Sequence, residues 1–182
     1  MTKEKKDTEK WLSLYAKNKY HAQFKIYKAY YKSMFNTCYR ILKNKELAED
    51  IMQEGFLSAF QNFNSFNKEY TLGAWLKKIM INKCLDELKR KKPELIITDK
   101  FEDIDEPEVV IDNSENINSL INKIKNAIMK LPDGYRIILS LYLIEGYDHE
   151  EIAEILNISS ATSRSQYFRA KKKLKEILSK NE

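Results

Sequence analysis

The stretch that decides the fold is DHEEIAEILNISSATSRSQYFRAKKKLKEIL, residues 148–178. Asp148, followed three residues later by Glu151, predicts a capping box at the start of a helix. Asn157 stands where the turn between two such helices usually has glycine, and asparagine tolerates a left-handed backbone better than most side chains. The stretch therefore predicts two helices joined by a tight turn, a helix-turn-helix.

The second helix of this pair is amphipathic, and Ser159 or Ser160 is expected to cap its start. One face is apolar and should pack on the rest of the domain, although Ser163 lies there where an aliphatic residue is expected. The other face carries long donors of the kind that read base edges in a major groove. The residues expected on this second face are Arg164, Ser165, Gln166, Phe168, Arg169 and Lys172. A helical hairpin with a merely solvated charged face is the alternative.

Three longer stretches upstream have apolar residues at intervals of three and four, which predicts amphipathic helices. They span residues 23–42, 46–63 and 72–92, and a shorter helix is expected near residues 9–18. The chain has only 4 Gly and 3 Pro, and no apolar run alternates with a period of two. We therefore predict an all-α protein.

Charge divides the chain into three parts. Residues 1–92 carry 20 Lys and Arg against 10 Asp and Glu, and residues 117–182 carry 11 against 8. Between them, residues 93–116 carry one Lys, 9 acidic residues and two of the three prolines. We predict two small helical domains, 1–92 and 117–182, joined by a flexible acidic linker. The basic domains suit a polyanionic partner, and a solvated lysine-rich surface is the alternative.

Several classes of protein are disfavoured by what the sequence lacks. The N-terminus shows no apolar signal segment, and the longest apolar stretch, 137–144, is too short to span a bilayer. Cys38 and Cys84 lack metal-ligand spacing, so we expect buried thiols, and His21 and His149 are far apart. No acidic triad, glycine-rich phosphate loop or nucleophile motif is visible. We expect neither a metal, a cofactor nor an enzymatic activity.

Two segments then resemble a known family. AEDIMQEGFLSAFQNFNSF (48–66), followed by WLKKIMINKCLDELKRKK (75–92), resembles region 2 of the extracytoplasmic-function (ECF) sigma factors. LPDGYRIILSLYLIEGYDHEEIAEILNISSATSRSQYFRAKKKLK (131–175) resembles their region 4. With the helix that precedes them, these stretches cover about four-fifths of the chain in the family's order, and nothing resembles region 3.

The resemblance implies a promoter-specificity subunit of bacterial RNA polymerase, which recognises the −35 and −10 elements and promotes DNA opening. Its implied partners are the polymerase core, through the clamp helices of the largest subunit and the flap of the second largest, promoter DNA and an anti-sigma factor. Whether a DNA-bound factor recruits it stays open. The implied location is the cytoplasm. The acidic linker is hypothesised to thread a basic polymerase channel, with a solvated spacer as the alternative.

The resemblance also assigns residues to three surfaces. Those implied to dock on the polymerase clamp are Asp50, Gln53, Glu54 and Phe56, and a core position is the alternative for Phe56. Those implied to meet the −10 element during melting are Phe66, Asn67, Lys68 and Tyr70 in the loop 66–71, with Trp75 and Asn82 on the following helix. The second helix of the helix-turn-helix is implied to read the −35 element, and Gln166 stands there where many members of the family have Arg.

Physical chemistry supports this reading of the N-terminal domain, because a protein opens a duplex if it binds unpaired bases better than paired ones. Aromatic platforms beside cationic side chains do this, at about 1–3 kcal/mol per stacked base. Trp75 suits such a platform, but its apolar neighbours make a core position the alternative. A conventional helix-turn-helix regulator that binds duplex operator DNA by itself is the second hypothesis for the whole chain.

Overall fold

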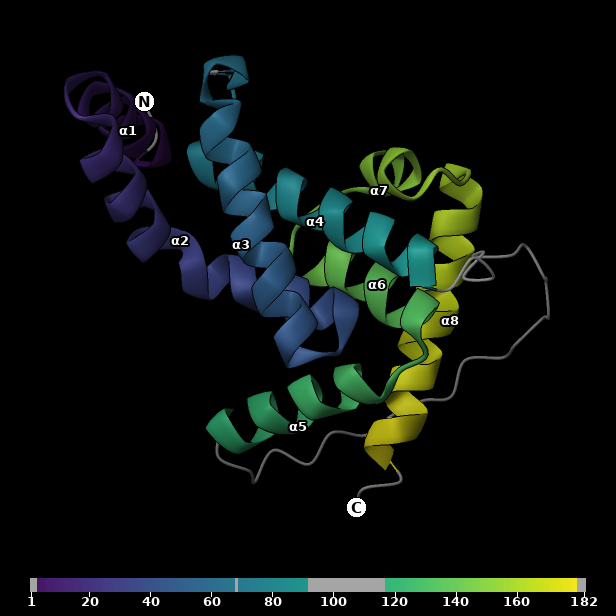
Figure 1. The fold of residues 1–182 in the computed structure, drawn as a ribbon. Helices are drawn as coiled ribbons and strands as arrows, with labels where there is room; N and C mark the ends of the chain where they lie inside the picture. The colour runs from purple at the N-terminus through teal and green to yellow at the C-terminus, as the bar shows by residue number, and fades with distance from the viewer. Residues whose placement is uncertain (1–2, 68, 92–116, 180–182) are drawn as a thin grey trace. The chain divides into compact units, whose positions relative to one another are not determined.

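The computed structural model describes residues 3–67, 69–91 and 117–179, and for residues 3–7 it describes the backbone only. Over these ranges the regular structure is entirely helical, as Figure 1 shows, which confirms the all-α prediction. The chain divides into two compact units, Met1–Arg90 and Lys91–Glu182. The predicted linker, residues 93–116, lies outside the described residues.

The first unit begins with two helices joined by one residue and continues with two more. Its elements are α1 (Lys3–Lys17), α2 (Lys19–Leu42), α3 (Lys45–Gln61), the 3-10 turn η1 (Phe63–Ser65) and α4 (Leu72–Lys91). Asparagine side chains cap two of these helices: Asn18 accepts from His21 N at 3.0 Å and Asn44 accepts from Leu47 N at 2.9 Å. Lys43, with φ 57°, turns the chain between α2 and α3.

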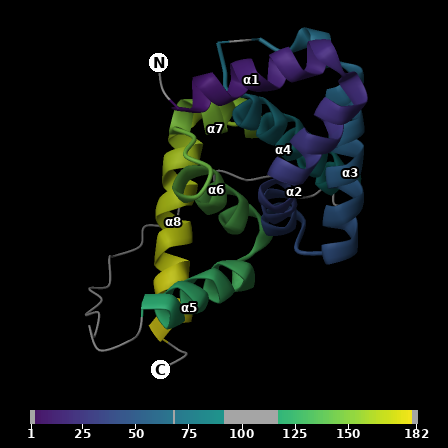
Figure 2. The same cartoon turned by 90° about the vertical axis from the view of Figure 1, so that its left-hand side faces the viewer.

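The core of this unit lies between α2, α3 and α4. Their inward rows include Ile26, Cys38, Met52, Leu76 and Met80, all at most 2% exposed. The helix α3 approaches α4 closely at Gly55, where a Cβ would lie 2.2 Å from Met80 Sδ. Figure 2 shows α1 running across the start of α4, where Leu72 N donates to Thr8 Oγ1 at 3.2 Å.

The two cysteines confirm the expectation of buried thiols. Cys38 on α2 and Cys84 on α4 are both free and fully buried. A hydrogen bond between the two side chains, together with burial, raises the pKa of the Cys84 thiol far above its ordinary value. Cys84 is therefore held as a neutral thiol, which packs as a small apolar side chain.

Between residues 117 and 179, the second unit has four helices around a small core. They are α5 (Ile117–Lys130), α6 (Asp133–Leu143), α7 (His149–Leu156) and α8 (Ser160–Ser179). Ile128 and Leu131 pack with Leu139 of α6 and Ala170 of α8, and half-buried apolar residues surround them. Leu131 and Pro132 connect α5 to α6, which begins at Asp133. Gly146 has φ +80°, which lets the chain leave α6 and enter α7.

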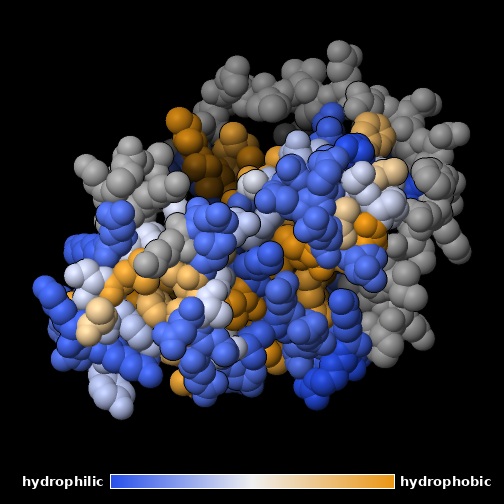
Figure 3. Space-filling view, turned by 90° about the horizontal axis from the view of Figure 1, so that it is seen from above, coloured by the Kyte–Doolittle hydropathy of each residue, from blue (hydrophilic) through white to orange (hydrophobic). Residues whose placement is uncertain are grey.

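The visible surface is mostly hydrophilic, with hydrophobic residues showing between the polar ones in Figure 3. None of the described helices is long and apolar enough to cross a membrane. Within the same residues, no three His, Cys, Asp or Glu side chains gather as a metal site would require.

Candidate functional site

The helix-turn-helix of α7 and α8 has the local geometry that its sequence predicts. Glu151 N donates to Asp148 Oδ1 at 2.8 Å and Asp148 N donates to Glu151 Oε2 at 2.9 Å, which completes the capping box. Asn157 adopts the left-handed conformation, with φ 56° and ψ 53°. Of the two candidate caps for α8, Ser159 fills the role, since its hydroxyl accepts from Thr162 N at 3.0 Å.

A polar contact joins the two helices inside this motif. Ser163 is fully buried on α8, and its Oγ lies 2.9 Å from Nδ1 of His149, the first residue of α7. The His149 ring stacks on Tyr142 of α6 at 4.6 Å between centroids, and Tyr167 of α8 packs on the Tyr142 ring at 4.4 Å. The serine found where an aliphatic residue was expected therefore has a partner of its own.

The outward face of α8 brings together most of the residues predicted to read DNA. Arg164 is exposed, and it donates to Glu150 Oε1 at 2.6 Å and to Ser160 Oγ at 3.3 Å. Phe168, Arg169 and Lys172 are half-buried on the same side, and so is Ser165, which donates to Thr162 O at 3.0 Å. Donors for base edges and for phosphates thus occupy the second to the fourth turn of α8.

Gln166 departs from this arrangement, and its predicted place on the outward face is wrong. It is 7% exposed, whereas Arg164 is exposed. At about 100° per residue, Gln166 falls in one row with the buried Ser163 and Ala170, and it lies on the opposite side of α8 from Arg164 and Phe168. The rotation of the helix, rather than the polarity of the side chain, decides which way Gln166 faces.

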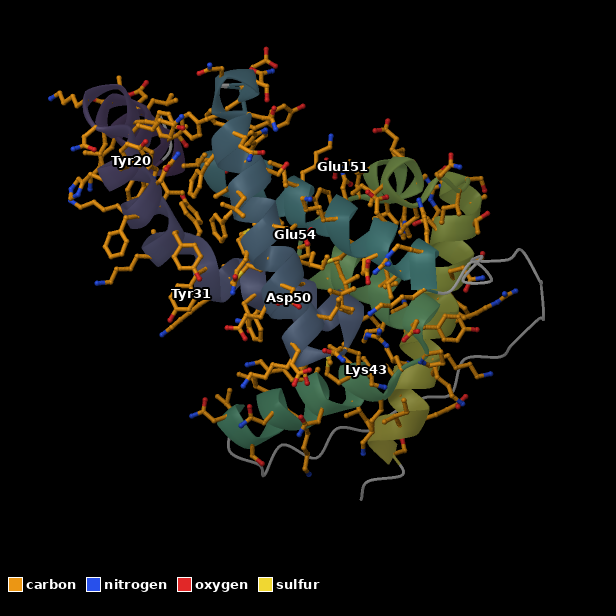
Figure 4. The ribbon with its side chains drawn as sticks, viewed as in Figure 1. Tyr20, Tyr31, Lys43, Asp50, Glu54 and Glu151 are labelled. Carbon is orange, nitrogen blue, oxygen red and sulfur yellow. The ribbon has the colours of Figure 1, made fainter. Side chains whose placement is uncertain are left out.

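On α3, three of the four residues assigned to the polymerase share one exposed face. Asp50, Gln53 and Glu54 are exposed, and Figure 4 shows Asp50 and Glu54 on the same helix. Glu54 Oε2 lies 3.8 Å from Nζ of Lys83 on α4. The fourth residue, Phe56, is not on this face.

Phe56 takes the core position that was its alternative, because its ring is 2% exposed and packs on Tyr27 at 5.0 Å. The residue that the sequence argument missed is Leu57, which is 61% exposed. Helical spacing places Leu57 in one row with Asp50 and Glu54, at intervals of four and three residues. That spacing could have identified it in the sequence.

The loop that follows η1 exposes some of its predicted residues and buries one. Asn67 is exposed, accepts from Glu69 N at 3.0 Å and donates to Glu69 Oε2 at 2.8 Å. Tyr70 is 61% exposed. Phe66 is only 8% exposed, so its predicted position as an open stacking surface is wrong. Lys68 lies outside the described residues.

Phe66 instead supports Trp75, whose ring centroid lies 5.2 Å away. Phe63 packs on Trp75 edge-on at 6.0 Å, and Tyr15 of α1 stacks on Phe63 at 3.8 Å. Trp75 is half-buried above this cluster, so it is both a core contact and a partly open ring. Asn82 is exposed two turns further along the same side of α4.

Known proteins match the chain in both units. The family models described as Sigma-70 region 2 and Sigma-70, region 4 match residues 26–94 and 121–174. The ECF RNA polymerase sigma factor SigW of Bacillus subtilis is 32% identical over 158 residues, which cover 82% of this chain and 84% of SigW. The sigma factor SigM of the same organism is 28% identical over 84% of this chain and 92% of SigM.

The chain belongs to the ECF sigma factors. In this sigma factor, the region 2 match includes α2 from residue 26 onward, with α3 and α4, and the region 4 match includes most of α5 with α6, α7 and the greater part of α8. It is therefore a promoter-specificity subunit of RNA polymerase, a role without enzymatic chemistry of its own.

Solved structures share the fold of this sigma factor. RpoE of Bartonella quintana, in complex with the anti-sigma factor NepR, aligns with a TM-score of 0.59 and 21% identity, covering 85% of this chain and 95% of that one. CnrH in complex with the cytosolic domain of CnrY aligns with a TM-score of 0.58 and 19% identity, covering 96% and 99%.

Proposed function

We propose that this sigma factor reads the −35 element with the outward face of α8, and that it captures the −10 element with the loop 66–71 and α4 while polymerase holds both units on one promoter. The observation that carries the proposal is the exposed N-terminal part of α8 within a complete helix-turn-helix. In such motifs this part of the second helix enters the major groove.

For the −35 element, Arg164 is the proposed base reader, because an exposed guanidinium can bind guanine through two hydrogen bonds, at about 1–3 kcal/mol of discrimination. Ser165, Phe168 and Arg169 are proposed to contribute on the same face. Lys172, one turn further on, is proposed to contact a phosphate, which positions the helix without reading sequence.

For the −10 element, the proposed capture surface consists of Asn67, Tyr70, Trp75 and Asn82, with Lys68 beside them in sequence. Tyr70 and the open part of Trp75 offer rings on which separated bases can stack. Phe66 is proposed to act from beneath, as a support that fixes the orientation of Trp75. An aromatic ring held by two others, Phe63 and Phe66, is preorganised, so little entropy is lost when a base stacks on it.

For polymerase, the proposed contact is the exposed face of α3, with Asp50, Gln53 and Glu54 around the apolar Leu57. Charged groups around one exposed aliphatic residue suit a contact in which a small apolar centre is closed by a polar rim. We propose the clamp helices of the largest subunit as the partner there, and the flap of the second-largest subunit as the partner of region 4. The proposed location is the cytoplasm.

An anti-sigma factor is a further proposed partner, because a solved sigma factor of the same fold, RpoE, is bound to the anti-sigma factor NepR. The proposed entry of the acidic linker into a polymerase channel concerns residues 93–116, outside the described part of the chain. Exchange of its acidic residues for Ser or Asn should reduce run-off transcription if the linker acts there.

The deciding experiment is run-off transcription with core polymerase on a promoter library randomised at both elements, together with gel shifts on a selected promoter. The proposal expects enrichment at two sites and a specific shift only when core is present. A stand-alone regulator would instead shift duplex DNA without core, and that result would overturn the proposal.

A further inference from the structure

An aromatic row runs along the N-terminal half of α2, outside every surface considered so far. Tyr20 is 82% exposed and Phe24 is 64% exposed. Tyr27 and Tyr31 continue the row and are half-buried. Successive members are three or four residues apart, so they lie on one side of the helix at intervals of about 5–6 Å along its axis. Figure 4 marks Tyr20 near the start of α2 and Tyr31 near its middle.

The inner half of this row is held rigidly. The rings of Tyr27 and Tyr31 stack at 5.8 Å with 16° between their planes. Tyr27 also packs edge-on against Phe56 in the core, at 5.0 Å. The outer half, Tyr20 and Phe24, is open to solvent. Single exposed aromatic residues are common. A continuous row of them whose inner rings are packed rigidly indicates a binding surface.

A second row, of lysines, runs beside the aromatic one. Lys25, Lys28 and Lys32 are all exposed, and their spacing places them together on the adjoining side of α2. The helix contains no acidic residue at any position. The row of rings is therefore bordered by positive charge that no carboxylate of the same helix neutralises.

This pairing of rows favours one class of partner. Protein interfaces are enriched in aromatic residues but depleted in lysine, so a protein partner accounts for only one of the two rows. Duplex DNA keeps its bases stacked and offers no ring face to Tyr20 or Phe24. A single strand has both required features, because unpaired bases stack on aromatic rings and phosphates follow a cationic track.

We propose that α2 binds single-stranded nucleic acid, with bases on the row from Tyr20 to Tyr31 and phosphates along Lys25, Lys28 and Lys32. The inference extends the proposed function, in which an opened promoter supplies the separated strand. It adds a contact site on a helix that the −10 assignment does not include.

The test measures fluorescence anisotropy of a labelled oligothymidine of about 12 nucleotides with the full-length protein, at several salt concentrations. The double variant Tyr20→Ala/Phe24→Ala should bind at least tenfold more weakly. The triple variant Lys25→Gln/Lys28→Gln/Lys32→Gln should lower the slope of log affinity against log salt by about 2, because each phosphate contact contributes roughly 0.7. Photocrosslinking with 5-iododeoxyuridine in the oligonucleotide should label Tyr20 or Phe24.

Tyr70→Ala is the matched control, since Tyr70 is an exposed aromatic on the proposed −10 surface. If Tyr70→Ala lowers promoter opening while crosslinks stay on α2, both proposals stand. If Tyr70→Ala leaves promoter opening unchanged, the −10 assignment is wrong, but the proposed binding of single-stranded nucleic acid by α2 is unaffected. The inference would be overturned if oligothymidine did not bind the wild-type protein, or if it bound the Tyr20→Ala/Phe24→Ala variant as tightly as the wild type. A double variant that no longer bound core polymerase but still bound oligothymidine would also overturn it, because α2 would then be a protein contact.

Discussion

The Nδ1 atom of His149 lies 2.9 Å from the hydroxyl of Ser163, and this contact joins the first residue of α7 to the buried side of α8. It is a polar contact in a place where helix-turn-helix motifs are expected to use an aliphatic side chain. Because α8 carries the proposed −35 surface, the contact couples the orientation of that surface to the ionisation of a histidine.

The first prediction concerns the pH dependence of region 4 stability. Partial burial, and after it the nearby Arg164 guanidinium, lower the pKa of His149, while Glu150 and Asp148 act in the opposite direction. The unfolded chain therefore binds a proton more readily than the folded one below the ordinary pKa of about 6.5. The free energy of unfolding should be greatest above that pH. It should fall as the pH drops through about 6.5 toward the lowered pKa of His149 in the folded state.

Urea unfolding followed by far-UV circular dichroism between pH 5 and 8 tests this expectation, with tryptophan fluorescence as an internal reference. Both tryptophans, Trp11 and Trp75, lie in the first unit, so fluorescence reports that unit alone. His149→Gln should remove the pH-dependent part of the circular dichroism transition. His21→Gln, which changes the only other histidine, should leave it in place. The reverse pattern would contradict the assignment.

The second prediction separates Gln166 from Arg164. Gln166→Ala removes a buried polar side chain and should lower the free energy of unfolding of region 4 by about 1–3 kcal/mol. It should not change the ratio of transcription from an intact −35 element to that from an altered one. Arg164→Ala should reduce that ratio by roughly tenfold or more at little cost in stability. If Gln166→Ala alters the ratio as strongly as Arg164→Ala, Gln166 reads DNA despite its burial.

The third prediction distinguishes the neighbours Phe56 and Leu57. Phe56→Ala should destabilise region 2 by about 3–5 kcal/mol, because it leaves a cavity between α2 and α3. Leu57→Ala should leave stability nearly unchanged and weaken holoenzyme formation, as should the pair Asp50→Ala and Gln53→Ala. Tryptophan fluorescence in urea measures the first effect, and competition for core polymerase measures the second. Normal core binding by Leu57→Ala would show that α3 docks through other residues.

The features that the sequence predicted well are local ones. The capping box at Asp148 and the left-handed Asn157 depend on contacts within a few residues, so their spacing alone is sufficient. The positions that the sequence left open or predicted wrongly, Phe56 in the first case and Phe66 and Gln166 in the second, depend on which helix packs against them. An aromatic or amide side chain suits a core and a surface equally well by type. Only the packing of Tyr27 on Phe56, or of Trp75 on Phe66, decides between the two.

The fourth prediction concerns Glu150, which holds Arg164 at 2.6 Å across the outer side of the helix-turn-helix. Both side chains are more than half exposed, so the ion pair adds little to stability. Its carboxylate lies beside the proposed DNA surface, where it should repel phosphates and also restrict the orientation of Arg164. Glu150→Gln should therefore strengthen binding of the holoenzyme to all promoters and reduce discrimination between −35 sequences.

Filter binding on matched and altered −35 promoters at low and moderate salt measures both effects of this change. Glu154→Gln is the control, because it removes the same charge from an exposed position one turn further along α7. General electrostatic repulsion alone would make the two variants alike, with equal gains on both promoters. An orienting role for Glu150 requires that its variant alone lose discrimination, since Glu150 forms an ion pair with the guanidinium that is proposed to read the base.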